Sequence, residues 1–267
     1  MADEAVPFDD RGLAYGDGLF ETVLVRDGRP LLWEEHMARL QEGCRRLGIA
    51  FPGRAHLDEL AVQSDPGLHV LKLLLTRGSG GRGYLPPERA APRLRWRSVP
   101  FVPQPTRWAE GVRVRLCDLT LGSQPRLAGI KHLNRLENVL ARQEWSDPEI
   151  AEGLLSDCRG HVIEATSMNL FWLCDGRWET PRLAECGVAG TLRAGLLDAF
   201  ELHEVMRGHD VFFEADSLWL GNSVQGVWPI ASLMDPSGTL LREWSVPSFD
   251  RSLQAEAHAL LGYPAPA

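Results

Sequence analysis

Lys131 gives the most direct indication of chemistry in this chain. It follows an uncharged run, residues 127–130, and precedes His132. An ammonium group that loses its water loses stability relative to the neutral amine, so its pKa falls. A neutral lysine is a nucleophile that can form an imine with a carbonyl. This chemistry suggests an aldehyde cofactor, although a lone lysine is more often a surface residue whose stem lies on apolar neighbours.

Glu164 is a candidate partner for such a cofactor. It lies in the segment 162–171, Val-Ile-Glu-Ala-Thr-Ser-Met-Asn-Leu-Phe, where a strand would deliver the carboxylate and small residues follow. A pyridine ring that accepts electrons works best with a protonated nitrogen, and a paired carboxylate keeps the proton there. Taken alone, Glu164 would more often be an exposed glutamate at a strand end.

Three further features could bind a phosphate group. The segment 187–193, Gly-Val-Ala-Gly-Thr-Leu-Arg, is a glycine-rich turn that leads into a helix, whose N–H groups and dipole favour anions. Ser223 follows a short strand and could donate a hydrogen bond. Arg39 lies two residues from the apolar face of a predicted helix, and its planar guanidinium suits a phosphate dianion. An ordinary helix entry and a solvated arginine remain the alternatives.

The glycine-rich loop over residues 78–83 matches Gly-x-Gly-x-x-Gly and follows a predicted strand. A dinucleotide site needs a helix to begin there and an acidic residue about twenty positions later. Tyr84-Leu85-Pro86-Pro87 follows instead, and proline at this point cannot begin that helix. The pattern therefore excludes a dinucleotide site, and the loop could bring Arg82 and Tyr84 to a substrate carboxylate.

Helices and strands are mixed along the chain without a regular strand–helix alternation, which predicts an α+β fold. Apolar residues at spacings of four and three between Trp33 and Leu47 predict a helix that ends at Gly48. The other predicted helices cover residues 132–145, 191–203 and 249–261. The predicted strands cover residues 19–25 before a turn at Asp27-Gly28, 69–76, 93–102, 111–116, several segments within 153–173, and 218–220.

Composition limits the function. The chain has 267 residues and a formal net charge of −8, which argues against a general nucleic-acid or membrane-surface binder. The five cysteines are scattered, so they predict reduced thiols in a cytoplasmic protein rather than disulfides or a metal site. The acidic segment 1–10 has no signal-peptide pattern. The apolar stretch 70–75 is far too short to span a bilayer.

The chain resembles the fold-type IV pyridoxal-phosphate enzymes, also called class IV aminotransferases. The motifs that carry the resemblance are Arg-Gly-Ser-Gly-Gly-Arg-Gly-Tyr at 77–84, Leu-Ala-Gly-Ile-Lys-His-Leu-Asn-Arg-Leu-Glu at 127–137, and Asn-Leu-Phe-Trp at 169–172. The resemblance implies a smaller N-terminal α/β domain and a larger C-terminal domain with a pseudobarrel. The change in sequence character after Leu119 places these domains at 1–119 and 120–267, with pyridoxal 5'-phosphate at their interface. It also implies a homodimer whose partner helps to build the substrate pocket.

The resemblance also implies roles for individual residues. The cofactor would be bound by Lys131 as the Schiff-base amine, Glu164 at the ring nitrogen, and Arg39, Ser223 and the backbone of Thr191 and Leu192 at the phosphate. Aminotransferases of the family commonly have threonine in place of Leu192, and leucine offers only its backbone N–H. Arg82 corresponds to a carboxylate-binding arginine of D-amino-acid aminotransferases.

The implied activity is that of a lyase branch of the family, which eliminates pyruvate from 4-amino-4-deoxychorismate to give 4-aminobenzoate. Lys131 would remove the proton from the carbon that bears nitrogen. The leaving oxygen would be protonated by the Lys131 ammonium or by the hydroxyl of Thr22. Strand alternation puts Phe20 and Thr22 on one face, at the implied pocket. A D-amino-acid or branched-chain aminotransferase, a non-catalytic cofactor-binding protein and a nucleotide-binding protein are the alternatives.

Overall fold

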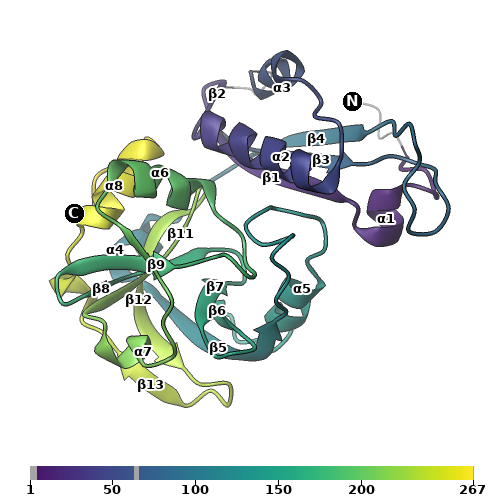
Figure 1. Ribbon diagram of the computed structural model, residues 1–267. Coiled ribbons are helices and arrows are strands. Elements are labelled where there is room, and N and C mark those ends of the chain that lie inside the picture. Colours follow the sequence, from purple (N-terminus) through teal and green to yellow (C-terminus); the bar gives the residue numbers. More distant parts are fainter. Residues whose placement is uncertain (1–4, 63–65, 267) are drawn as a thin grey trace. The chain divides into compact units, whose positions relative to one another are not determined.

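The computed structural model describes residues 5–62 and 66–266, which form two compact units (Figure 1). Unit 1 comprises residues 1–101 and 130–135, and unit 2 comprises residues 102–129 and 136–267. The division therefore falls after Phe101, earlier than the expected boundary at residue 119. The reason is that the strand Val112–Leu121 pairs with two strands of unit 2. The first four residues of the acidic N-terminal segment lie outside the described residues.

Unit 1 is built on a four-stranded antiparallel sheet in the order β2-β1-β3-β4. The longest helix of this unit, α2, lies along one face of the sheet (Figure 1). The elements of the unit are α1 (Arg11–Tyr15), β1 (Gly18–Arg26), β2 (Arg29–Pro30), α2 (Trp33–Leu47), α3 (Arg54–Ala61), β3 (Leu68–Thr76) and β4 (Arg93–Pro100).

The sequence signals at the ends of β1 and α2 are confirmed. Asp27 and Gly28 both have positive φ, 49° and 75°, as a two-residue hairpin turn between β1 and β2 requires. α2 ends at Leu47, and Gly48 caps it with φ 64°. Glycine adopts this left-handed conformation without the steric cost that a Cβ atom brings.

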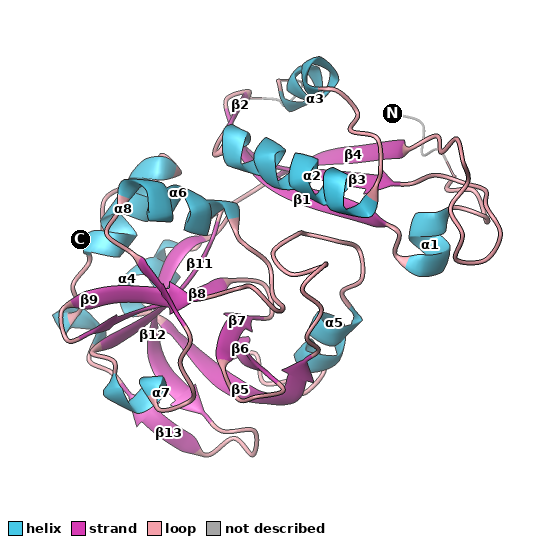
Figure 2. Ribbon diagram, in the orientation of Figure 1, coloured by secondary structure: helices cyan, strands magenta, loops and turns pink. Residues whose placement is uncertain are grey.

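Unit 2 is built on a curled nine-stranded sheet in the order β10-β9-β8-β11-β12-β5-β6-β7, with β13 paired to β12 (Figure 2). Its strands are β5 (Val112–Leu121), β6 (Ile150–Asp157), β7 (Val162–Ala165), β8 (Asn169–Cys174), β9 (Arg177–Pro181), β10 (His203–Val205), β11 (Ser217–Asn222), β12 (Gly226–Met234) and β13 (Leu240–Glu243). Its helices are α4 (Pro105–Glu110), α5 (Leu136–Arg142), α6 (Thr191–Ala199), α7 (Val211–Glu214), the 3₁₀ turn η1 (Val246–Ser248) and α8 (Ser252–Leu260). Together the two units confirm the α+β class.

The segment before α5 is not helical, contrary to the prediction of a helix from His132. The Phe20 N–H donates to the Lys131 carbonyl at 2.9 Å, and the Leu133 N–H donates to the Gly18 carbonyl at 3.0 Å. These long-range hydrogen bonds hold the segment in extended form beside β1, so the helix begins only at Leu136. Tertiary pairing therefore overrides the local helical pattern.

Two other helices are shorter than predicted, for local reasons. α6 ends at Ala199 because Phe200 is extended, with φ −135° and ψ 148°, and His203 begins β10. α8 begins at Ser252 rather than Phe249, which follows the 3₁₀ turn and is also extended.

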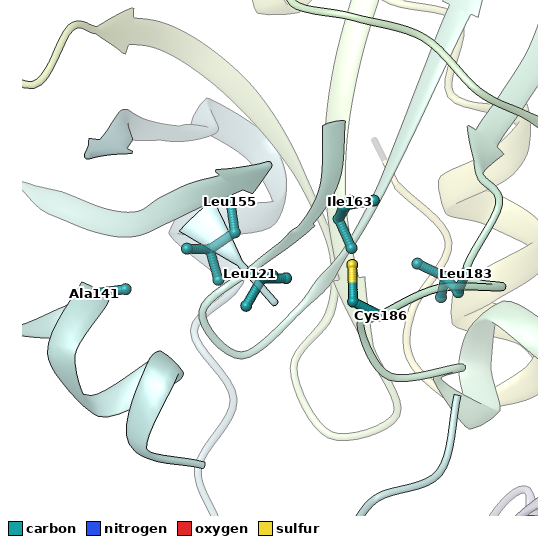
Figure 3. Close-up of a cluster of buried hydrophobic side chains, with 6 residues drawn as sticks. All are labelled: Leu121, Ala141, Leu155, Ile163, Leu183 and Cys186. Carbon is teal, nitrogen blue, oxygen red and sulfur yellow. The ribbon is translucent and has the colours of Figure 1, made fainter. Parts of the chain in front are cut away.

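A cluster of buried hydrophobic side chains lies in unit 2 and includes a residue of β7 (Figure 3). Ile163 of β7 contributes its side chain, and Leu183 and Cys186 contribute from the segment between β9 and α6. Leu121, Ala141 and Leu155 complete the cluster. Burial of these side chains fixes β7 and the 183–186 segment against one another, and the next residues of each are Glu164 and Gly187.

All five cysteines are free thiols, as predicted. Burial raises the pKa of Cys44 to about 11 and that of Cys186 to about 12, so both are inert thiols at neutral pH. Among the described residues, the helices are too short or too polar to cross a membrane.

Candidate active site

Lys131 lies beside the aromatic ring of Phe20 in unit 1. The chain has only two lysines, Lys72 and Lys131. The Nζ atom of Lys131 is 4.6 Å from the centroid of the Phe20 ring, and that of Lys72 is 5.6 Å away. Lys131 is half-buried and held by backbone pairing to β1, whereas Lys72 is exposed. Of the two amines, Lys131 is therefore the better shielded from water.

Thr22 belongs to the same face of β1 as Phe20. Both residues are half-buried, whereas Glu21 between them is buried on the opposite side. In the β1–β3 register Thr22 stands opposite Lys72. The predicted alternation is therefore present, and a hydroxyl lies on the strand face that also carries Phe20.

Arg39 of α2 is held by Glu21. The Arg39 Nε donates to Glu21 Oε1 at 2.9 Å, and Arg39 Nη2 bonds the other carboxylate oxygen. His36, one turn earlier on α2, bonds Glu21 Oε2 through Nδ1 at 2.7 Å. One carboxylate therefore fixes one edge of the guanidinium, which carries five N–H donors in all.

The charges of this cluster are strongly coupled. Glu21 is 1% exposed, and burial alone would raise its pKa. The charge and hydrogen bonds of Arg39, together with the hydrogen bond from His36, outweigh burial and lower the pKa of Glu21 to about 2. Burial lowers the pKa of His36. The hydrogen bond to Glu21 and the charge of Glu21 oppose this shift, whereas the positive charges of Arg39 and Lys131 act with burial. At neutral pH the cluster therefore holds an ionised Glu21 beside a neutral imidazole.

Arg82 and Tyr84 lie on an exposed loop of unit 1, which the buried Arg11 holds in shape. Arg11 Nη1 donates to the Gly83 carbonyl at 2.9 Å, and Arg11 Nη2 donates to the Tyr84 carbonyl at 3.1 Å. The next regular element is the strand β4 rather than a helix. The exclusion of a dinucleotide site is therefore consistent with the structure, and both side chains remain available to a ligand.

Glu164 is buried at the end of β7 in unit 2, with 4% of its surface exposed. Its Oε2 atom accepts a hydrogen bond from the Val188 N–H at 2.7 Å. Glycine is needed beside it, because a Cβ atom on Gly187 would lie 3.3 Å from Glu164 Oε2 and 2.8 Å from the Ile163 side chain. The glycine-rich turn and the carboxylate thus meet, as the two motifs suggested.

The helix α6 begins directly after this turn. Its first turn contains no acidic side chain, and Gly190 is its N-cap. The Gly190 carbonyl accepts from the Ala194 N–H at 2.9 Å, so the amides of Thr191 and Leu192 precede the helical hydrogen-bond ladder. Leu192 is 1% exposed, so its side chain lies in the core. Such a helix start favours an anion.

Ser223 lies in a tight turn after β11 and is 9% exposed. Asn222 shapes this turn, because its Oδ1 atom accepts from the N–H groups of Val224 at 2.9 Å and Gln225 at 2.7 Å. Unit 2 therefore carries Glu164, the start of α6 and Ser223. Unit 1 carries Lys131, Phe20, Thr22, Arg39, Arg82 and Tyr84.

Sequence reasoning gave no role to several residues that hold these groups in place. Glu21 and His36 hold Arg39. Asn169 accepts from the Gly190 N–H at 3.1 Å and donates to the Val188 carbonyl at 2.9 Å. Such residues can be recognised in a sequence as charged or amide residues at positions that strand or helix periodicity predicts to be buried. A buried polar group of this kind needs a hydrogen-bond partner.

The comparison with known proteins identifies the family. A model described as amino-transferase class IV matches residues 18–233. The chain belongs to this family. Its relatives in the family include the aminodeoxychorismate lyase of Vibrio harveyi, 34% identical over 93% of this chain and 94% of that protein. The D-alanine aminotransferase of Bacillus licheniformis is 25% identical over 86% of this chain and 83% of that protein.

Solved structures give the same result. The 4-amino-4-deoxychorismate lyase of Pseudomonas aeruginosa superposes with a TM-score of 0.87 at 42% identity and covers 96% of this chain and 95% of that one. This likeness confirms the fold-type IV architecture predicted from the motifs.

Class IV enzymes depend on pyridoxal 5'-phosphate, and the residues present fit that group. A half-buried lysine offers an amine, and a buried carboxylate stands beside a glycine turn that leaves no room for a Cβ atom. A helix start without acidic residues suits the phosphate. The cofactor prediction is confirmed at the level of the family.

Proposed function

We propose that this class IV enzyme is a pyridoxal-phosphate-dependent lyase that converts 4-amino-4-deoxychorismate to 4-aminobenzoate, a folate precursor, and pyruvate. The observation that carries the proposal is the likeness to lyases over almost the whole chain, at 34% and 42% identity. The presence of Lys131, Glu164, Thr22 and a basic loop residue, Arg82, supports it.

The family resemblance suggests a role toward the cofactor for each of these residues. Bound pyridoxal phosphate supplies an aldehyde that takes up the substrate amine and a ring that withdraws electrons from the adjacent carbon. Lys131 would hold the aldehyde carbon at rest. Glu164 would keep a proton at the ring nitrogen. The phosphate would be bound by Arg39, Ser223 and the backbone of Thr191 and Leu192.

Lys131 would act as the base once the substrate amine has replaced it. Its amine would remove the proton from the carbon that bears the substrate nitrogen. The neighbouring carbon would then lose its enolpyruvyl oxygen, which takes a proton from the Lys131 ammonium or the Thr22 hydroxyl. Phe20 lies against Lys131 and would shield this amine from water.

Arg82 and Tyr84 would bind a carboxylate of the substrate. The side chain of Arg82 is exposed, as is that of Tyr84, and the backbone of their loop is fixed by Arg11. A guanidinium on a fixed loop can recognise a carboxylate with two parallel hydrogen bonds. This placement is consistent with a dicarboxylate substrate.

A homodimer in the cytoplasm is part of the same proposal. Large apolar side chains are exposed around α1 and the 82–85 loop, namely Phe8 at 96%, Tyr84 at 86%, Leu85 at 72% and Leu13 at 66%. A cluster of this kind is typical of a protein–protein interface. The free thiols favour a reducing compartment.

A D-amino-acid or branched-chain aminotransferase is the second candidate, because the D-alanine aminotransferase of B. licheniformis is also a relative. The two reactions are separated by supplying purified enzyme with 4-amino-4-deoxychorismate and following fluorescent 4-aminobenzoate. A parallel reaction with an amino acid and 2-oxoglutarate is assayed for glutamate. Formation of glutamate without 4-aminobenzoate, with cofactor bound, would favour the aminotransferase.

A further inference from the structure

A buried carboxylate of unit 2, Glu152 of β6, has no part in the function described above. It is 6% exposed and lies beneath the turn that joins β7 to β8. The Ala165 N–H closes this turn by donating to the Met168 carbonyl at 2.8 Å. The hydroxyls of Thr166 and Ser167 each donate to one oxygen of Glu152, and the Ser167 N–H donates at 3.2 Å. One side chain therefore holds the whole tip of the turn.

The turn is joined to three parts of the proposed cofactor site. Glu164 lies two residues before Thr166 on the same segment of the chain. Asn169, two residues after Ser167, bonds the N–H of Gly190, the N-cap of α6. The Ser167 carbonyl accepts from Asn222 Nδ2 at 3.3 Å, and Asn222 shapes the turn that carries Ser223.

Burial raises the pKa of Glu152, while the bonds from Ser167 and Thr166 and the charge of Arg142 oppose this shift. A buried acid that no hydrogen bond satisfied would be costly. The three donors of the turn reduce this cost only when the turn has its present shape. The acid and the turn conformation therefore stabilise one another.

We infer that Glu152 is a positioning residue for the phosphate-binding half of the site. It acts through the 165–168 turn on the start of α6 and on Ser223, without touching the cofactor. The inference rests on the phosphate contacts of the proposed function. Loss of the Glu152 carboxylate should weaken binding of the phosphate group more than binding of the aldehyde and ring.

The test compares two probes, pyridoxal 5'-phosphate and pyridoxal, which share the ring and aldehyde and differ in the phosphate. Dissociation constants are measured by absorbance titration for the wild type, Glu152→Ala and Glu152→Gln. We expect Glu152→Ala to weaken pyridoxal phosphate binding by about tenfold or more, since several hydrogen bonds to a carboxylate are lost. Pyridoxal binding should change by less than about threefold, and Glu152→Gln should be intermediate because one acceptor oxygen remains.

Asp235 provides a matched control. It also accepts from a serine hydroxyl and backbone N–H groups, those of Ser237 and Thr239, but on an exposed turn. Asp235→Ala should leave both dissociation constants unchanged. If Glu152→Ala does not fold, Ser167→Ala removes one donor at an exposed residue and should weaken pyridoxal phosphate binding in the same direction.

Two results would overturn the inference: unchanged pyridoxal phosphate binding in Glu152→Gln and Ser167→Ala, or an equal loss for both probes. A wild type that binds pyridoxal as tightly as pyridoxal phosphate would instead remove the phosphate site itself, and this inference with it. The two failures are therefore distinguishable from the wild-type measurement alone.

Discussion

Each unit holds the residues that the proposed function uses, and the two units do so by different means. In unit 1, Arg39 is fixed by the ionised Glu21, and the substrate loop is fixed by Arg11, which also pairs with Asp17 at 2.9 Å. In unit 2, Glu164 and Asn169 bond backbone N–H groups, and Glu152 bonds two hydroxyls. The first arrangement depends on ionisation, whereas the second depends on backbone conformation.

Two buried glutamates, Glu21 and Glu152, show the difference most clearly. In unit 1 a nearby guanidinium holds the pKa of Glu21 at about 2. In unit 2 burial is not offset by such a partner, and the pKa of Glu152 is raised. A fall in pH should therefore weaken the contribution of Glu21, and a rise in pH should weaken that of Glu152.

Replacing Lys131 should have the largest effect, because one amine would both hold the cofactor and act as the base. Lys131→Ala should lower turnover by about 10⁴-fold or more, since both an amine contact and a general base are lost. The measurement is 4-aminobenzoate formation under saturating cofactor. Near-normal turnover in this variant would contradict the assignment.

Replacing Glu164 should separate chemistry from cofactor binding in unit 2. Glu164→Gln keeps the shape and an acceptor for the Val188 N–H but removes the charge. We expect kcat to fall by about 10²-fold, as for loss of one aligned electrostatic contact. The dissociation constant for pyridoxal phosphate, measured by titration, should hardly change. A variant that fails to bind cofactor would remove the support for a role at the ring nitrogen.

The contributions of Glu21 and Glu152 to the free energy of unfolding should change in opposite directions with pH. Glu21 has a depressed pKa, so its contribution is present above the unfolded value of 4.5 and is lost as pH falls through about 2. That difference corresponds to about 3 kcal/mol at neutral pH. Urea unfolding of Glu21→Gln should therefore show a loss of about this size at neutral pH that shrinks in acid. A loss that is independent of pH would refute this electrostatic account.

Glu152 should give the reverse trend. Its raised pKa means that its contribution is present below 4.5 and declines as pH rises through the folded-state value. Glu152→Gln should therefore gain stability relative to the wild type as pH rises. A wild-type advantage that grows with pH in the same urea experiment would show that the carboxylate is stabilised as an ion.

The smallest effect is expected at Leu192. Its side chain is in the core, so only its backbone N–H could reach a phosphate. Leu192→Thr should leave the pyridoxal phosphate dissociation constant within about threefold, but burial of a hydroxyl should cost about 2 kcal/mol of unfolding free energy. Markedly tighter cofactor binding in this variant would show that the threonine hydroxyl reaches the phosphate.

Local sequence patterns correctly predicted those turns and helix ends whose conformation is determined by their own residues. The Asp27-Gly28 turn and the Gly48 cap are examples, because a positive φ is a property of the residue itself. The start of α5 was predicted wrongly because the backbone of Lys131 and Leu133 pairs with β1, far away in the sequence. The strand Gly226–Met234 was not predicted at all, although it lies at the centre of the second sheet.

The same contrast applies to the site. Motifs identified Lys131 and Glu164, because reactive residue types follow one another in recognisable segments. The supporting residues Glu21, Asn169 and Glu152 were not given roles. Their partners lie on other elements, and only folding brings these groups together.

Reduction of the resting enzyme with borohydride, followed by proteolysis and peptide mapping, tests the central claim most directly. The chain offers two lysines, Lys131 and Lys72, whose amines lie 4.6 Å and 5.6 Å from the same Phe20 ring. We expect all of the trapped cofactor on the peptide that contains Lys131, and full retention of the label in Lys72→Ala. A label on the Lys72 peptide, or no label on enzyme that holds cofactor, would contradict the account.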